Sequence, residues 1–195
     1  AGAAQARNHL RPYVLCAARL DLRHKALDSL ISGFALVARE HQNVDLLISG
    51  DGPDRSLLEE LAKSFALAER VKFLGIVSRA ELWRLYKGAL LFAMPSRMPE
   101  GLGLTFLEAM ASGLAVVGTR SGGTPEIVKE GVTGLLVEHN QPDELSSAIS
   151  TLIKDRGRAV AMGDTGRRIA ARCYGWPRFS EQYAELYASC LHASS

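Results

Sequence analysis

The 195-residue chain has few cysteines and no grouping of metal-binding side chains. Its three cysteines, Cys16, Cys173 and Cys190, are scattered and odd in number. Such a set does not form the disulfide framework of a small secreted domain and is typical of a reducing cytoplasm. The five histidines lie far apart, and no Asp-x-Asp pair occurs. We therefore expect no metal, no bound cofactor and a cytoplasmic location.

Long apolar runs and a strong charge of one sign are also missing. No run approaches the roughly 20 residues of a membrane-spanning helix, so no transmembrane segment is expected. The net charge of +2 gives no global electrostatic case for binding nucleic acid. The start of the chain is too polar for a signal peptide. Residues 1–12 are interpreted as a linker or a cut end, and residues 13–195 as one domain.

What the sequence does contain is an alternation of short apolar segments with amphipathic ones. The spacing of apolar residues predicts helices between the apolar segments and three more after the last one, at about 142–154, 156–172 and 177–192. Unbroken apolar strands that alternate with helices indicate an α/β fold with a doubly wound parallel sheet, which is Rossmann-like. The predicted strands are 13–18, 44–48, 71–75, 90–95, 115–118 and 133–138.

Polar or glycine-rich segments follow most of these strands at their carboxyl ends, where parallel sheets bind their ligands. We therefore expect these loops to converge on one site. Arg19 and Lys25 flank the first loop and suit a diphosphate. Gly50 lets the backbone approach a ligand closely, or only turns the chain. His24 is assigned no role in proton transfer.

The segment 100–113 is the most distinctive of these loops. A glycine-rich turn there opens into a helix that begins near Gly103, whose N-terminal amides and dipole favour an anion such as phosphate. Glu100 and Glu108 can face the space beside that anion. Two carboxylates that bind hydroxyls on either side of a phosphate suit a nucleotide sugar. A dinucleotide site is not expected, because Phe106 stands where the dinucleotide fingerprint has its third glycine.

Purely structural roles for these residues also stay open. The glycines before the helix can form only a tight turn, and Glu108 can belong to a solvated helix face. Ser78 and Glu81 are expected to form a capping box at the start of the helix that runs to Lys87. Thr124 and Pro125 are expected to cap and begin a short helix. The glycines before them, at 122–123, are interpreted as an anion nest, with Glu126 either part of it or stabilising the helix N-terminus.

In its order of segments, the chain resembles the C-terminal, donor-binding half of retaining glycosyltransferases of family 4 (group 1), which have the GT-B fold. The resemblance covers about residues 13–190. It rests on these segments: 18–21 with 24–25, 50–53, 71–75, 95–96 with 100–113, 122–128 and 131–137.

The resemblance implies roles for individual residues. Glu100 corresponds to the catalytic-site carboxylate that holds hydroxyls of the transferred sugar, and Glu108 to the one that binds the ribose. Arg19 and Lys25 correspond to the basic pair that neutralises the diphosphate leaving group, without a metal. Ile76 and Val77 correspond to the segment whose backbone contacts the base, and the amides around Gly103, Leu104 and Thr105 would complete the diphosphate cradle. The other implied donor-binding residues are Gly50, Gly101 and Leu102.

Two residues depart from the family pattern and leave the donor sugar open. Ala26 stands where the family often has glycine, and Leu102 stands where many members have an aromatic residue. Neither change removes a charged group.

The resemblance also implies a missing half, since GT-B enzymes take their acceptor site from an N-terminal domain. We expect a hexosyltransferase-like domain that binds a nucleoside-diphosphate sugar, is inactive alone, and has that N-terminal domain as its partner. The missing half leaves room for peripheral contact with a membrane. The alternatives are a same-fold epimerase or phosphorylase, or a non-catalytic nucleotide-binding module. The last helix is expected either to dock on the missing half or to pack on this domain's own sheet, through Phe179, Tyr183, Leu186 and Tyr187.

Overall fold

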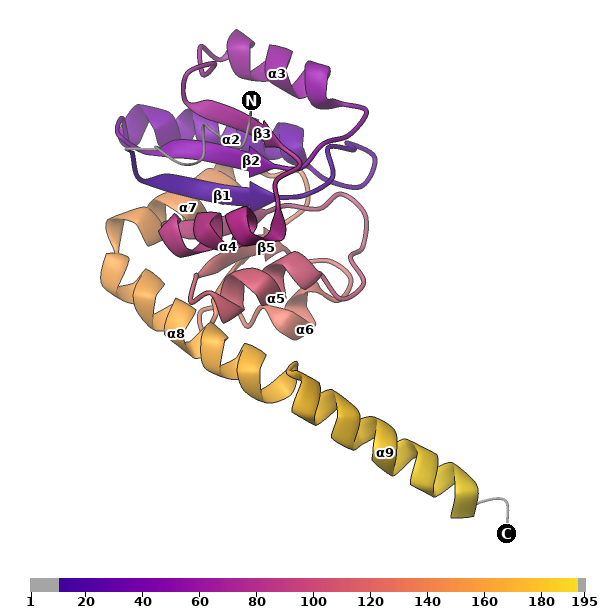
Figure 1. The fold of residues 1–195 in the computed structure, drawn as a ribbon. Helices are drawn as coiled ribbons and strands as arrows, with labels where there is room; N and C mark the ends of the chain where they lie inside the picture. Colours follow the sequence, from indigo (N-terminus) through magenta and orange to yellow (C-terminus); the bar gives the residue numbers. More distant parts are fainter. Residues whose placement is uncertain (1–10, 193–195) are drawn as a thin grey trace.

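The computed structural model describes residues 11–192, which contain a parallel six-stranded sheet (Figure 1). The strands lie in the order β3-β2-β1-β4-β5-β6, and every neighbouring pair is parallel. The doubly wound parallel sheet predicted from the apolar segments is confirmed. The strands are β1 (Tyr13–Ala17), β2 (Asp45–Ser49), β3 (Val71–Gly75), β4 (Leu91–Met94), β5 (Val116–Thr119) and β6 (Gly134–Val137).

Helices cover both faces of the sheet. In Figure 1, α4 and α5 lie on the near side, whereas α2 and α7 pack on each other on the far side. Helix α8 follows α7 and packs against α5. The bounds are α2 (Leu27–Glu40), α3 (Arg55–Ser64), α4 (Arg79–Gly88), α5 (Leu104–Ala111), α6 (Thr124–Ile127), α7 (Pro142–Lys154), α8 (Arg156–Cys173) and α9 (Trp176–His192).

Aromatic side chains fill the core between the sheet and the near-side helices. Phe92 of β4 lies edge to face with Phe106 of α5, with ring centroids 5.7 Å apart, and both side chains are fully buried. Burial of one such ring stabilises the fold by about 2–3 kcal/mol. A Cβ atom on Gly118 would lie 2.7 Å from the Phe106 ring. Phe106, which stands where the dinucleotide fingerprint has its third glycine, is therefore a core residue.

Two predicted helix caps differ in detail from the structure. Ser78 Oγ accepts a hydrogen bond from the Glu81 N–H (3.2 Å), as predicted, but the reciprocal contact from the Glu81 carboxylate is not among the bonds of the described residues. The predicted cap at Thr124 is wrong by one residue, because Gly123 is the N-cap of α6. Thr124 is instead buried, with its methyl group packed near Gly118.

The predicted N-terminal linker falls largely on residues 1–10, which lie outside the described part of the chain. Its last two residues are held against β2. The Asp45 N–H donates to Pro12 O (2.9 Å), and Arg11 pairs with the Asp45 carboxylate (3.6 Å). Within residues 11–192, none of the helices has the length and apolar character needed to cross a membrane.

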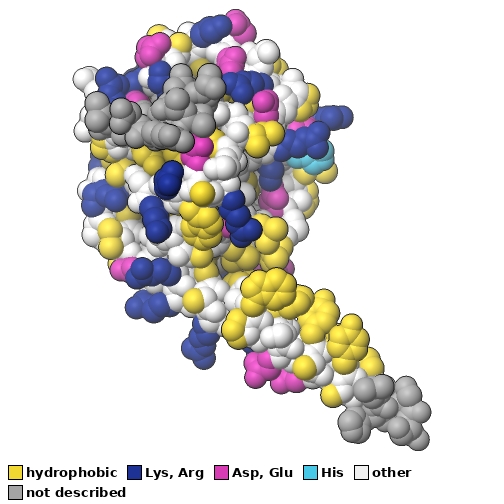
Figure 2. Space-filling model, viewed as in Figure 1, with side chains coloured by type: hydrophobic (Ala, Val, Ile, Leu, Met, Phe, Trp, Pro, Cys, Tyr) yellow, Lys and Arg dark blue, Asp and Glu magenta, His cyan; other side chains and the backbone are white. Residues whose placement is uncertain are grey.

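Helix α9 extends away from the body of the domain, so the alternative that it packs on the domain's own sheet is wrong (Figure 1). Yellow, hydrophobic side chains lie along it in Figure 2. Its exposed aromatic residues form a ladder of Trp176, Phe179, Tyr183 and Tyr187. Neighbouring rings in this ladder are 4.4–6.3 Å apart, and between 47% and 80% of each residue is exposed. This leaves a large apolar surface open to a partner.

Thiol reactivity tests the burial of β1. Burial raises the pKa of the Cys16 thiol to about 12, although the nearby charge of Lys25 lowers it. A raised pKa keeps the thiol protonated and unreactive at pH 8. We expect Ellman's reagent to titrate Cys173 and Cys190, which are exposed, and to reach Cys16 only in denaturant. Equal reaction rates for all three thiols in the native chain would contradict this placement.

Candidate functional site

The candidate site lies where the strand order reverses, between β1 and β4. The sequence continues from β1 towards β2 on one side and from β4 towards β5 on the other. Open parallel sheets bind ligands at such a switch point, outside the carboxyl ends of the strands. The predicted loops 19–25 and 95–103 are the two segments that leave the sheet there.

These two loops are joined by backbone hydrogen bonds. The Ala26 N–H donates to Pro95 O (3.1 Å), and the N–H groups of Arg97 and Met98 both donate to His24 O (2.8 and 3.2 Å). The same contact forms a bridge between Lys25 and Ser96. The first and fourth loops therefore form one unit at the switch point.

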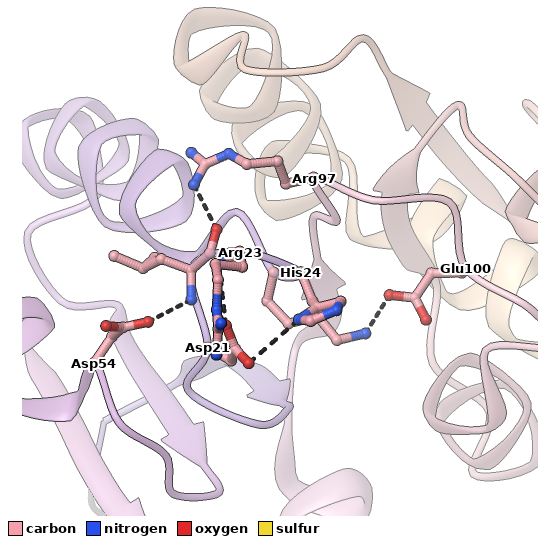
Figure 3. A network of polar contacts seen from close by, with 8 residues as sticks. Asp21, Arg23, His24, Asp54, Arg97 and Glu100 are labelled. Atoms are coloured by element: carbon pink, nitrogen blue, oxygen red, sulfur yellow. Dashed lines mark hydrogen bonds and ion pairs between the residues drawn. The ribbon is translucent and has the colours of Figure 1, made fainter.

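Arg97 fastens this unit from outside. Figure 3 shows its side chain reaching from the loop after β4 to the loop after β1, where Nη1 donates to Leu22 O (2.6 Å). Its Nη2 also pairs with the Asp28 carboxylate of α2 (2.9 Å). On the other side of the loop, the Leu22 N–H donates to Asp54 Oδ2 (2.7 Å). The backbone of the first loop is thus held from both sides.

Asp21 is a buried carboxylate at the centre of the first loop. Burial alone raises its pKa, but the Arg23 N–H (3.1 Å), His24 Nδ1 (3.2 Å) and the charge of Arg23 more than offset this and hold the pKa below its usual range. Asp21 is therefore ionised at neutral pH. Its hydrogen bonds help to fix the conformation of the loop that carries Arg19 and Lys25.

Glu100 is held by two donors on the same oxygen. Its Oε1 pairs with Lys25 Nζ (Figure 3). The same oxygen accepts a hydrogen bond from Ser96 Oγ (2.5 Å). The Lys25 and Glu100 side chains are only 16% and 17% exposed. The structure thus brings two predicted site residues into direct contact. It leaves Oε2 of Glu100 without a recorded partner in the described part of the chain.

Arg19 is exposed, and no acidic partner for it is recorded within residues 11–192. It lines two adjoining hollows. The first, of about 280 Å³, contains the Lys25–Glu100 pair, together with Asp21, His24, Met98 and Pro99. The second, of about 350 Å³, is lined by Ala17, Ala18, Ser49, Gly50, Asp51, Ile76, Val77, Leu82 and Thr105. The free guanidinium therefore stands between them.

The N-terminus of α5 presents open backbone groups beside the second hollow. Gly103 is the N-cap in the left-handed conformation (φ +60°), and it makes no side-chain capping bond. The Phe106 N–H donates to Gly103 O (2.9 Å), whereas no hydrogen bond is recorded for the N–H of Leu104 or Thr105 in the described residues. Such a terminus can accept an anion.

Several predicted contacts line neither hollow. They are Gly101, Leu102, Gly103, Leu104 and Glu108. Leu102 and Leu104 are 54% and 65% exposed, an unusual position for two leucines beside a polar site. Glu108, one turn further along α5, is half-buried and accepts a hydrogen bond from the Tyr86 hydroxyl (3.2 Å).

The turn at Gly122 and Gly123 supports the site and does not form the predicted anion nest. The Gly123 N–H donates to Glu100 O (2.8 Å), and the Thr124 N–H donates to Ser121 O (3.1 Å), so both amides are occupied. A Cβ atom on Gly123 would lie 2.1 Å from Gly101 O. The glycines therefore allow close packing under the Glu100 loop. Glu126 is exposed in the first turn of α6, the position in which it would stabilise the helix N-terminus.

The sequence analysis missed some residues that the structure brings to the site. Ser96 and Tyr86 each hold one of the two glutamates, and Asp21, Met98 and Pro99 line the first hollow. Ser96 could have been found, since it lies four residues before Glu100. Tyr86 carries no such signal, because it lies on another helix.

Comparisons with known proteins identify the family of the chain. A family model described as glycosyl transferases group 1 matches residues 3–169. The chain belongs to this family. The fold is likewise that of GT-B glycosyltransferases, to which its structural neighbours belong.

Among the relatives of this group 1 glycosyltransferase domain is a GDP-mannose-dependent alpha-(1-6)-phosphatidylinositol monomannoside mannosyltransferase of Mycobacterium tuberculosis. The two are 38% identical over 182 residues, or 90% of this chain and 47% of the relative. The chain thus spans about half the length of the curated relatives it matches.

Two solved structures have the same fold. The Anabaena protein HepE, solved with UDP-glucose, has a TM-score of 0.84 and 28% identity over 92% of this chain and 49% of its own. The C-terminal domain of a group 1 family glycosyl transferase from Francisella tularensis has a TM-score of 0.78 and 23% identity, over 90% of this chain and 94% of that one.

Close packing at Gly123 gives a stability prediction. Gly123→Ala should lower the free energy of unfolding by about 2 kcal/mol, since the new methyl group overlaps Gly101 O. Gly101→Ala is the matched control on the other side of the contact, because nothing lies within 4 Å of its added Cβ. That control should change stability by less than about 0.5 kcal/mol in urea unfolding. Equal effects of the two substitutions would show that the loops do not pack as described.

Proposed function

We propose that this chain is the C-terminal, donor-binding half of a retaining group 1 glycosyltransferase of family 4. It would bind a nucleoside-diphosphate sugar and take part in moving the sugar to an acceptor. The observation that carries the proposal is the convergence at the switch point of the Lys25–Glu100 pair, the free guanidinium of Arg19 and the open N-terminus of α5.

The two hollows suggest how the donor lies. The diphosphate would sit between them, against Arg19 and the amides of Leu104 and Thr105, where positive partial charge is concentrated. The sugar would lie in the first hollow beside Glu100. The nucleoside would lie in the second hollow, where Ile76 contributes to the lining.

The Lys25–Glu100 pair then has two tasks. An ammonium group has three donors, and so Lys25 can hold Glu100 and still donate to a diphosphate oxygen. Glu100 Oε2 is left to accept hydrogen bonds from sugar hydroxyls. The paired charges keep both side chains in place before the donor arrives, which reduces the entropy lost on binding.

The proposed chemistry is the stabilisation of a leaving group. Negative charge grows on the diphosphate as its bond to the sugar breaks, and donors fixed in advance around that charge lower the barrier. Arg19, Lys25 and the α5 amides would supply these donors without a metal ion. Within residues 11–192, no three His, Cys, Asp or Glu side chains are grouped so that they could hold one.

The comparisons support a nucleotide sugar as donor but leave its base open. HepE was solved with UDP-glucose, and the mycobacterial relative is GDP-mannose-dependent. The residues that line the second hollow are mostly small or aliphatic, and they give no preference between the two. A phosphorylase that uses pyridoxal phosphate is less well supported. The Lys25 amine that it would need as a nucleophile is held by Glu100.

The acceptor side is proposed to come from a second domain. The chain spans about half of its relatives, and a C-terminal domain from Francisella tularensis has the same fold over nearly its whole length. The aromatic ladder of α9 is a suitable surface for contact with that domain. Any contact with a membrane would then be made by that second domain. The cytoplasmic location stays a prediction.

Substitution of the two glutamates tests the donor site. Glu108→Gln should weaken a free nucleoside diphosphate and its sugar-bearing form alike, by about tenfold, because it removes a charged hydrogen-bond acceptor for the ribose. Glu100→Gln should weaken only the sugar-bearing form. Calorimetric titration with UDP, GDP and ADP, and with UDP-glucose and GDP-mannose, measures both effects.

Glu126→Gln is the matched control, since Glu126 is an exposed glutamate on the neighbouring α6 and has no part in the proposed donor site. The titrations are run in EDTA, and repeating them with magnesium should leave the affinities unchanged. Equal losses for both ligand types in both variants would refute the assigned roles. No loss in either variant would place the donor elsewhere.

The proposed division of labour predicts that this chain binds a donor and transfers no sugar. The opposing wall, which positions an acceptor hydroxyl and excludes water, would come from the proposed second domain and would lower the barrier by several kcal/mol. The test is incubation with radiolabelled donor and candidate acceptors, with and without the N-terminal half of a relative. Rapid transfer by this chain alone would contradict the proposal.

A further inference from the structure

Glu108 is held in a different way from Glu100. Its recorded side-chain partner in the described residues is the Tyr86 hydroxyl, which donates to Oε2 over 3.2 Å. No Lys, Arg or His of the described part lies within salt-bridge distance of Glu108. The contact joins α4 to α5, the helix whose N-terminus would hold the diphosphate.

Packing fixes the direction of the Tyr86 hydroxyl. Tyr86 is 1% exposed, and its ring packs against Phe92 of the central strand β4 (centroids 5.7 Å) and against Trp83 (6.1 Å). A ring enclosed in this way has few alternative rotamers. The Tyr86 hydroxyl therefore donates to Glu108 from one direction only.

The hydroxyl also stays a donor at every working pH. Burial, followed by the nearby charge of Glu108 and their hydrogen bond, raises the pKa of Tyr86 above its usual value. The phenol therefore remains protonated beside the carboxylate. Because the phenol is neutral, it orients the carboxylate and leaves its negative charge in place, whereas a lysine would neutralise that charge.

We propose that Tyr86 is a positioning residue for ribose recognition. It holds Oε2 of Glu108, and so Oε1 remains available to accept hydrogen bonds from the 2′ and 3′ hydroxyls of a nucleotide. The inference rests on the proposed function, in which Glu108 binds the ribose. The inference adds that the strength of the contact between Glu108 and the ribose depends on Tyr86 of α4, which itself touches no part of the nucleotide.

The test separates ribose binding from general effects on the fold. Tyr86→Phe removes the donor and keeps the ring. UDP, GDP and ADP are each titrated beside their 2′,3′-dideoxy forms, which lack both hydroxyls. We expect the unaltered chain to prefer the ribose form. Tyr86→Phe should then weaken the ribose form by about tenfold and leave the dideoxy form unchanged.

Tyr13→Phe is the matched control. Tyr13 is also buried, and its hydroxyl donates to Leu85 O on the same helix (2.8 Å), away from both hollows. This control should not change the preference for ribose. In a Glu108→Gln background, Tyr86→Phe should cause little additional loss, because the two residues act on the same contact.

Each other outcome counts against the inference. Equal losses for the ribose and dideoxy forms, or no loss in Tyr86→Phe, would give Tyr86 a purely structural role. An unaltered chain that binds none of the nucleotides would overturn the proposed function. An unaltered chain that binds the nucleotides without preferring the ribose form would overturn only the role of Glu108. The inference about Tyr86 fails in either case. If Tyr86→Phe does not fold, Tyr86→Met removes the same donor and replaces it in the comparison.

Discussion

The parallel pairing of β1 with β4 is the constraint on which the rest of the site depends. It aligns Val14 with Leu91 and Leu15 with Phe92, so the two strands end together at the edge of the sheet. The loops that follow are joined by the bridge between Lys25, at the end of the loop after β1, and Ser96, at the start of the loop after β4. A site built on such a bridge takes its precision from the sheet and not from the loops themselves.

From this bridge, the arrangement of charge follows. Lys25 and Glu100 are close because their loops are joined, and Gly123 lets a third loop pack beneath them. Because the cationic and anionic side chains neutralise each other, the free-energy cost of their partial burial is reduced. Arg19 lines both hollows, and no acidic partner for it is recorded among residues 11–192. The structure therefore concentrates positive charge at one point without a large net charge.

Much of the fold could be predicted because it depends on local patterns. Apolar runs such as 44–48 and the periodic spacing of α2 reflect which side chains each element buries, and these signals lie within a few residues of one another. The cap at Thr124 could not be placed correctly. A threonine before a proline is a good local cap, but here its methyl group is needed in the core beside Gly118. Tertiary packing outweighed local preference at that position.

The amino-acid sequence by itself determined the parallel sheet, the edge at which the candidate site lies, and the residues that carry charge there, including Arg19 and Glu100. Only the tertiary structure decided which of these residues meet. Lys25 and Glu100 are 75 residues apart, and Tyr86 and Glu108 are 22 apart on different helices. Their contacts depend on the order in which strands enter the sheet and on how the helices pack over it. No pattern local to either partner carries that information, because each contact is created by the packing of segments between them.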